Sequence, residues 1–341
     1  MVLVAGRYQS LLRRWQMKTG EDRLVQKITQ ALAFKGRRRL ALGAGDDAAL
    51  LQPTPGLQLI LTCDWFLEGS HFLRDRHPPD SVGWKCLARA VSDVAAMGGE
   101  PRCFLLSLAL PETHTGKWLD GFLRGLRRSA RRFDCHLAGG DTTRNDKILI
   151  NATVIGEVPT GRAVLRSGAK PGDLIFVSGR LGEAEFGLRA LRSGGAKTHR
   201  KSRCVKKHLY PEPRLDLGRW LARNRLVTAM MDLSDGLSTD LTRLCAASGS
   251  GARIAFDKIS KVAMPKEKGR THFDATELAL HGGDDYELLF AVRPNQVRRL
   301  PSAFQGLMLS CIGEITRKRQ LLLVRPEGYE EQLVARGWDP F

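Results

Sequence analysis

The sequence predicts a mixed α/β fold (α+β mixed), and three observations lead to this prediction. Short apolar runs typical of strands recur along the chain, amphipathic helical patterns lie between several of them, and glycine-rich turns follow many of the runs. This alternation is typical of proteins in which helices cover a sheet. At 341 residues, the chain is long enough for two domains of ordinary size, each with its own core.

Apolar runs predict strands at 57–63, 103–110, 147–158, 173–178, 227–233, 252–257, 286–292 and 307–315. Helical spacing predicts two helices. Leu87, Val91 and Val94 share one face of a helix over 81–97, and a second apolar stripe runs over 116–133.

The clearest domain boundary follows Gly156–Pro159, where the polar stretch "TGRAVLRSGAKPGD" leads into the strand "LIFVSG". We therefore expect a disordered basic extension at 1–19, an N-terminal domain at 20–158 and a C-terminal domain at 159–341. Within the last, "RSGGAKTHRKSRCVKKHLYPEP" predicts a basic loop up to the helix after Pro213.

Composition narrows the class of protein. An apolar fraction of 43% and a charged fraction of 26% are typical of a soluble globular chain, and no apolar run is long enough to span a membrane. The seven cysteines contain no CxxC pair, which argues against a disulfide framework or a structural zinc and favours a cytoplasmic protein.

The net charge of +18 suits either an RNA-binding protein or an enzyme that acts on polyphosphates. The basic residues cluster at 37–39, 127–132 and 197–207 with few aromatics between them. This pattern favours a solvated basic surface over a nucleic-acid site, and RNA binding is kept as the alternative.

Several isolated acids have small or apolar neighbours. They are Asp46 and Asp47 in "GAGDDAAL", Asp64 in "LTCDWF", Asp93 in "AVSDVAAMGG", Asp141 in "LAGGDTTR", Asp232 and Asp235 in "MMDLSDGLSTDL", and Asp284 and Asp285 in "HGGDDYELLF". Each alone is also explained as a turn former or a helix cap. A partly buried carboxylate is costly unless it is paired, hydrogen-bonded or bound to a metal. Together these acids offer hard oxygen ligands from several turns, which suits Mg²⁺.

Magnesium ions in such a setting would neutralise a polyphosphate and hold it for phosphoryl transfer. The sequence contains no GxxxxGK[ST] loop and no kinase DFG or HRD signature. The residues therefore predict a magnesium-dependent nucleotide enzyme outside the common kinase folds.

These motifs together resemble the thiamine-monophosphate kinase family, part of the superfamily that includes aminoimidazole ribonucleotide synthase. The resemblance extends from about Gly20 to Phe341 and rests on motifs in the family's order: "GAGDDAAL", "CDWFLEGSHF", "VGWKCLARAVSDVAAMGGEP", "GGDTTR", "GRAVLRSGAKPGD", "DLSDGLSTDL", "GGDDYELLF" and "RGWDPF". It implies ATP-dependent phosphorylation of thiamine monophosphate, two α/β domains, and an N-terminal sheet that forms a barrel across a homodimer.

The resemblance also implies roles for individual residues. The Mg²⁺ ligands would be Asp47, Thr62, Cys63, Asp64, Asp93, Asp141, Asp232 and Asp235, with Asp141 and Asp232 catalytic. ATP would contact Gly140, Asp141, Arg166 and Ser234, and the acceptor would contact His71, Asp284 and Trp338. Two positions depart from the family: Cys63 stands where threonine is usual, so a backbone carbonyl would have to be the ligand, and Asp284 stands where glutamate is common.

Other functions predict different features. A selenophosphate synthetase would need a reactive cysteine in a glycine-rich N-terminal loop, and the hydrogenase-maturation relative carries a C-terminal cysteine; neither is present here. An RNA-binding protein would bind in a strongly salt-dependent way but leaves the ordered acids unexplained. A non-catalytic regulator would not need intact acidic motifs.

Overall fold

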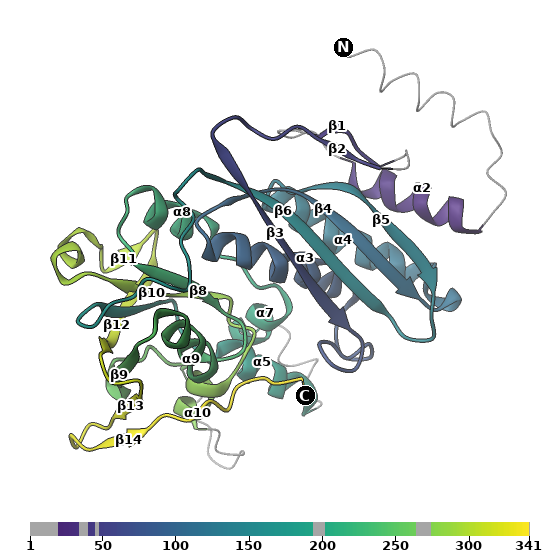
Figure 1. Cartoon of the computed structure of the whole chain (residues 1–341). Helices are drawn as coiled ribbons and strands as arrows, with labels where there is room; N and C mark the ends of the chain where they lie inside the picture. The colour runs from purple at the N-terminus through teal and green to yellow at the C-terminus, as the bar shows by residue number, and fades with distance from the viewer. Residues whose placement is uncertain (1–19, 34–39, 45–47, 194–201, 264–273, 341) are drawn as a thin grey trace.

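The computed structural model describes the chain except residues 1–19, 34–39, 45–47, 194–201, 264–273 and 341 (Figure 1). The expected basic extension and the pair Asp46 and Asp47 therefore lie outside the described residues. The described part forms two large sheets, one from each half of the chain, and a small two-stranded sheet.

The N-terminal half contains a four-stranded sheet in the order β3-β6-β4-β5, in which only β4 and β5 are parallel. Its strands are β3 (Leu57–Leu67), β4 (Glu100–Leu110), β5 (His136–Arg144) and β6 (Leu149–Pro159). Helices α3 (Pro79–Ala96) and α4 (Lys117–Arg132) lie together on one face of this sheet (Figure 1).

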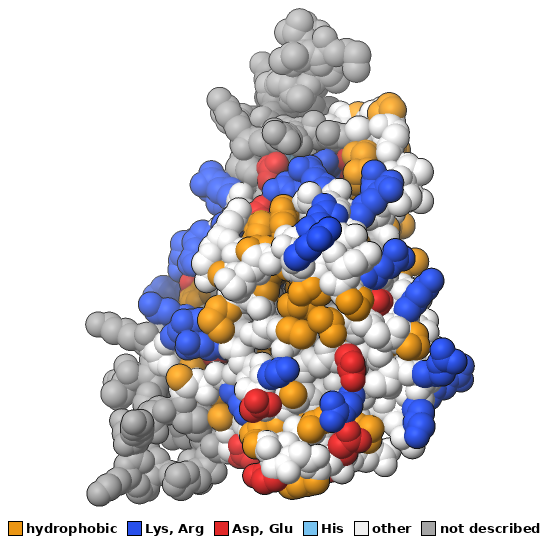
Figure 2. Space-filling model, turned by 90° about the vertical axis from the view of Figure 1, so that its left-hand side faces the viewer, with side chains coloured by type: hydrophobic (Ala, Val, Ile, Leu, Met, Phe, Trp, Pro, Cys, Tyr) orange, Lys and Arg blue, Asp and Glu red, His pale blue; other side chains and the backbone are white. Residues whose placement is uncertain are grey.

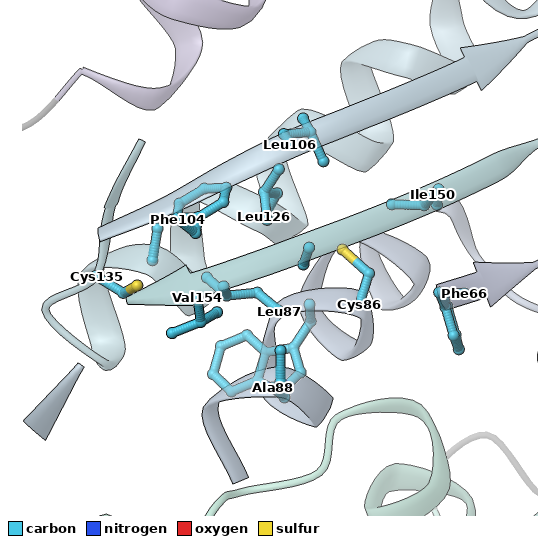
Figure 3. Packing of buried hydrophobic residues seen from close by; sticks show 14 of the residues in the cluster. Phe66, Cys86, Leu87, Ala88, Phe104, Leu106, Leu126, Cys135, Ile150 and Val154 are labelled. Carbon is cyan, nitrogen blue, oxygen red and sulfur yellow. The ribbon is translucent and has the colours of Figure 1, made fainter. Parts of the chain in front are cut away.

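The core of this half lies between the two helices and the sheet (Figure 3). Leu87 of α3 and Leu126 of α4 are fully buried, as are Phe104 of β4 and Val154 of β6. The apolar stripe that predicted each helix is therefore the face that packs on the sheet.

The other face of the same sheet is apolar but exposed to solvent within one chain. Leu59, Leu61, Trp65 and Leu105 have 43%, 70%, 54% and 38% of their surface exposed. Residues along β3 alternate between the faces, so Ile60 is buried under the helices while its neighbours are exposed.

The C-terminal half contains an eight-stranded sheet in the order β14-β13-β9-β12-β7-β10-β8, with β11 paired to β12. Its strands are β7 (Leu174–Ser178), β8 (Ala229–Leu233), β9 (Gly251–Ala255), β10 (Glu287–Val292), β11 (Ala303–Phe304), β12 (Leu307–Thr316), β13 (Leu321–Val324) and β14 (Glu330–Gln332). Its helices are α5 (Glu183–Arg192), α7 (Arg203–Leu209), α8 (Leu215–Arg223), α9 (Leu237–Ser248) and α10 (Ala275–His281).

The remaining described elements are short or peripheral. They are helix α2 (Gly20–Leu32), strands β1 (Leu40–Leu42) and β2 (Leu50–Leu51), and the 3₁₀ helices η1 (Glu112–His114), η2 (Phe256–Lys258) and η3 (Pro294–Arg299). Helix α2 packs on α4 and β5 and adds Ile28 and Leu32 to the N-terminal core.

All eight expected strands and both expected helices are present, which confirms those predictions. Three expectations were wrong in detail. The first strand continues past residue 63 to Leu67, because its buried and exposed positions keep alternating through Phe66. Asp141, counted among the acids of the turns, lies instead in edge strand β5. The expected basic loop contains helix α7, whose seven residues are too few to give a clear periodicity.

On one face of the molecule the basic side chains are dispersed rather than gathered (Figure 2). On the face in Figure 2, Lys and Arg side chains are spread widely, and Asp and Glu side chains lie among them in the lower half. No helix in the described part of the chain is long and apolar enough to cross a membrane.

Candidate active site

A pocket of about 750 Å³ lies where the two halves of the chain meet. Its wall combines residues of β3 and α3 with the turns after β8 and before β10 and with the C-terminal segment. This volume is within the range of pockets that bind small molecules and cofactors.

Three of the predicted metal ligands come together on one side of this pocket. Asp64 projects from β3 toward α3, Asp93 lies in the last turns of α3, and Asp232 is at the end of β8 and is 3% exposed. Thr62 faces the same way as Asp64, since its hydroxyl donates a hydrogen bond of 2.5 Å to the Asp93 carboxylate.

Burial and mutual repulsion disfavour the charged form of these acids. Burial, with further contributions from Asp93, Asp235 and Asp284, raises the pKa of Asp64 from 3.8 to about 6. Burial also raises the pKa of Asp93, and burial together with the charge of Asp93 raises the pKa of Asp232 well above its ordinary value. The three acids are therefore disfavoured from ionising together unless a cation compensates their charge.

This donor set fits Mg²⁺, which prefers carboxylate and hydroxyl oxygens and would relieve the repulsion. Among the described residues, no three His, Cys, Asp or Glu side chains converge closely enough to hold an ion by themselves. Any bound ion therefore needs further oxygens, such as those of water or a phosphate.

The turn after β8 adds Ser234 and Asp235 to the pocket wall. The buried carboxylate of Asp240, in the first turn of α9, accepts hydrogen bonds from the backbone N–H groups of both residues, at 3.1 and 3.0 Å. Arg243 forms an ion pair with Asp235. These contacts hold the turn in one conformation before any ligand binds.

Asp284 lines the same pocket in a left-handed backbone conformation with φ of 66°, and its backbone N–H donates a hydrogen bond of 2.8 Å to the Ser234 carbonyl. The buried Lys85 ammonium donates a hydrogen bond of 2.8 Å to it, and the Tyr286 hydroxyl donates another of 2.7 Å. Although burial alone would raise the pKa of Asp284, the charge of Lys85 lowers it. Asp284 is thus a carboxylate fixed in both charge and direction.

His71 and Trp338 are neighbours in the same pocket, with ring centroids 6.1 Å apart. Burial lowers the pKa of His71 to about 4, so the ring is neutral near pH 7. Its Nδ1 accepts a hydrogen bond of 3.1 Å from the Leu67 N–H, which leaves the proton on Nε2 as a donor.

Trp338 is brought to the pocket by the C-terminal segment. Its backbone N–H donates a hydrogen bond of 2.9 Å to the Asp235 carbonyl, and the preceding Gly337 donates one of 3.0 Å to Thr239. A Cβ at Gly337 would lie 1.9 Å from the Asp235 carbonyl oxygen, so glycine is required there. The indole remains 45% exposed and available to a ligand.

Sequence reasoning missed Arg89, which lines the pocket from α3. Its guanidinium lies 3.9 Å from Asp64 and 3.7 Å from Asp284, above the ring of Phe66 at 5.4 Å. The available signal was the spacing of Lys85, Arg89 and Asp93, which places the three on one side of the helix.

Gly140 and Asp141 do not line this pocket in a single chain. They lie on β5, the opposite edge of the sheet from β3, so three strand spacings of about 4.8 Å separate them from Asp64. Strand pairing also sets Asp141 in one row with Trp65, on the exposed apolar face.

Three other predicted residues have different positions. Arg166 is exposed outside the pocket wall, although its charge acts on Asp93. The Cys63 side chain is exposed on the face of β3 that points away from Thr62 and Asp64, so its thiol does not join their cluster. Asp47 lies outside the described residues.

Comparison with known proteins identifies relatives over nearly the whole chain. Residues 45–158 match the N-terminal domain of the AIR synthase related proteins, and residues 170–324 match the C-terminal domain. A thiamine-monophosphate kinase of Escherichia coli O157:H7 is 36% identical over 335 residues, which cover 95% of this chain and 99% of the relative.

Solved structures of thiamine-monophosphate kinases are also similar to this chain. The thiamine-monophosphate kinase from Stenotrophomonas maltophilia K279a has a TM-score of 0.76 and 35% identity, over 89% of this chain and 94% of that one. A structure described as "AaThiL complexed with AMPPCP and TMP" has a TM-score of 0.72 and 30% identity, over 96% of this chain and 100% of that one. The two-domain mixed α/β fold is therefore that of the AIR synthase related proteins.

Proposed function

Because the chain belongs to the thiamine-monophosphate kinase family, we propose that it transfers the γ-phosphate of ATP to thiamine monophosphate, giving thiamine diphosphate and ADP. One observation carries the proposal: a single pocket combines a crowded acid cluster with a fixed acid, a neutral histidine and an exposed indole. The acid cluster suits metal-bound phosphates, and the fixed acid, the histidine and the indole suit an aromatic acceptor.

The metal side of the pocket would be formed by Asp64, Asp93 and Asp232, with Asp235 beside them. Bound Mg²⁺ would supply the positive charge that neutralises the donor's phosphates during transfer. Thr62 already hydrogen-bonds Asp93, so the residues that would meet the metal are ordered by contacts within the protein.

The acceptor side would be formed by His71, Asp284 and Trp338. The indole of Trp338 can stack on a cationic or heteroaromatic ring of the acceptor, and Asp284 can accept hydrogen bonds from amino groups of the acceptor. The attacking group would be a phosphate oxygen, which is already anionic, so this pocket does not need a strong general base. His71 is consistent with this reaction, since its Nδ1 is occupied by the Leu67 N–H and its Nε2 is a donor rather than a base.

The proposed homodimer would complete the site. The exposed apolar face of the N-terminal sheet supports an interface, since monomers rarely leave large contiguous apolar patches in water. A barrel closed by two such sheets would join the edges β3 and β5 of different copies. Gly140 and Asp141 of one copy would then lie beside Asp64 of the other copy. Asp141 and Asp64 could therefore belong to one site, although they are far apart within a single chain.

The expected boundary near residue 158 and the compartment also remain part of the proposal. The two sheets are built from residues on either side of this position. All seven cysteines are free thiols, which supports an enzyme of the reducing cytoplasm.

The test is thiamine diphosphate formation by the purified protein with thiamine monophosphate, ATP and Mg²⁺. The Asp232→Asn and Asp141→Asn variants should lose activity while keeping their fold by circular dichroism. ATP turnover without this product would indicate a different acceptor within the superfamily. No ATP chemistry, combined with tight and salt-sensitive RNA binding, would refute the proposal in favour of a nucleic-acid function.

A further inference from the structure

We infer that Arg89 binds the phosphate of the acceptor and aligns its attacking oxygen with the donor. This inference rests on the proposed function and adds a positioning residue to it. It starts from a row on one side of α3, in which Lys85, Arg89 and Asp93 are spaced four residues apart.

The two ends of this row already have partners. Lys85 donates to Asp284 on the acceptor side, and Asp93 accepts from Thr62 on the metal side. Because one turn of helix advances about 5.4 Å, Arg89 lies about one turn from each end. This is where a phosphate must sit if it belongs to the acceptor and attacks a metal-bound donor.

Arg89 has unused hydrogen-bonding capacity. Its nearest carboxylate oxygens, on Asp64 and Asp284, lie at 3.9 and 3.7 Å, beyond hydrogen-bonding distance. Its Nε is buried and has no acceptor in the described part of the chain. A buried guanidinium nitrogen without an acceptor is costly, and a phosphate can accept two hydrogen bonds from a guanidinium in bidentate geometry.

Two other arginines of the pocket wall differ in this respect. Arg243 hydrogen-bonds Asp235 and Asp240, and Arg189 hydrogen-bonds Glu185 at 2.7 Å. Asp284 does not depend on Arg89 either, since Lys85 and Tyr286 satisfy it. Arg89 thus has two long ion pairs but, unlike Arg243 and Arg189, no hydrogen bond to either carboxylate. Its position above the Phe66 ring fixes the guanidinium plane instead.

The test separates the acceptor's phosphate from the rest of the acceptor. Isothermal titration of the full-length protein, without ATP, gives dissociation constants for thiamine monophosphate and for thiamine. We expect Arg89→Gln to weaken thiamine monophosphate binding by about ten- to a hundredfold and thiamine binding by less than about twofold. The KM for ATP should stay within about twofold. Arg124→Gln, which removes the same charge from the exposed side of α4, is the matched control and should change neither ligand.

Each remaining outcome decides the question. The role of Arg89 is overturned if Arg89→Gln weakens the binding of both ligands equally, or if it does not weaken the binding of thiamine monophosphate. It is also overturned if the wild-type protein binds both ligands equally well. If Arg89→Gln does not fold, Arg89→Lys takes its place, because it keeps the charge and loses only the bidentate geometry. Undiminished binding of thiamine monophosphate by that variant also overturns the inference. A wild-type protein that makes no thiamine diphosphate contradicts the proposed function instead, whatever the variants bind.

Discussion

Replacing Asp64 by asparagine should stabilise the metal-free protein while removing its activity. The acids of the pocket repel one another, and burial deprives them of water, so the folded chain holds Asp64 ionised at a cost. The substitution Asp64→Asn removes that charge with little change in the shape of the side chain. The new amide oxygen would be a weaker metal ligand than the carboxylate, so the metal side of the pocket should lose its function.

The size of the effect follows from the pKa of Asp64, which rises from 3.8 to about 6. The attraction of Arg89 is already included in this value. One pKa unit corresponds to about 1.4 kcal/mol, so ionised Asp64 destabilises the folded state by at most about 3 kcal/mol above pH 6. Since 30% of the side chain is exposed to water, the measured value should be between about 1 and 3 kcal/mol.

The sign of the pH dependence is fixed by the raised pKa. Below about pH 4, Asp64 is protonated in both the folded and the unfolded chain, and the variant gains nothing. The difference grows as the pH rises from about 4 to about 6 and is constant above it. Mg²⁺ reverses the order, since it binds the wild-type folded state more tightly and stabilises it by mass action.

The assay is urea unfolding, followed by tryptophan fluorescence, in EDTA at about pH 4.5 and about pH 7.5 and again with saturating Mg²⁺. Asp146→Asn, at an exposed position before β6, is the control and should change the free energy of unfolding by less than about 0.5 kcal/mol. A metal-free Asp64→Asn protein that is less stable than wild type at the higher pH would refute the reasoning. So would a difference that does not change with pH.

Three further predictions follow from other contacts. Lys85→Met leaves Asp284 without its buried partner, so it should lower the free energy of unfolding by about 3 kcal/mol near pH 7.5 and raise the KM for the acceptor. Because Lys85 lowers the pKa of Asp284, this stabilisation is present above about pH 4 and is lost only below it; urea unfolding near pH 7.5 and steady-state kinetics check both effects. Gly140→Ala places a Cβ 1.9 Å from the Leu106 carbonyl oxygen at a residue with positive φ, so β5 should detach from β4. The free energy of unfolding should fall by more than about 3 kcal/mol, which thermal unfolding and hydrogen exchange would measure. Trp338→Ala should raise the KM for the acceptor about tenfold and leave the KM for ATP unchanged, because the half-exposed indole lies beside His71 on the acceptor side of the pocket. Steady-state kinetics with each substrate varied in turn check this.

Much of the fold could be predicted because burial leaves a periodic record in the sequence. The stripes on α3 and α4 and most of the eight apolar runs mark surfaces that exclude water, whereas Leu59 and Leu61 of the first run lie on the exposed face of the N-terminal sheet. Strand β5 left no such record, since "HLAGGDTTR" lies at a sheet edge and four of its nine residues are exposed. Its Gly140 is explained only by the close approach of the Leu106 carbonyl in the neighbouring strand, which is a tertiary contact.

The acids of the site could be predicted because each is a charged residue among small or apolar neighbours, a setting that is typical of buried positions. Asp232 at the end of an apolar strand is such a case. Their grouping could not be derived from spacing, because Asp64, Asp93 and Asp232 come from a strand, a helix and a second sheet. The family resemblance supplied that grouping, and it also included Asp141, which strand order separates from the others within one chain.

Arg89 marks the limit of both kinds of reasoning. The apolar stripe of α3 explains why Leu87, Val91 and Val94 are buried, but the same helix has a second side that faces the pocket. Sequence alone does not say what that side meets, since its partners come from residues far away in the chain. Once the fold sets Asp284 against Lys85 and Thr62 against Asp93, the arginine between them is left with a charge and a buried Nε that has no acceptor among the described residues. A site that binds two phosphates in line would use a cation at that point, which is the role that we propose for Arg89.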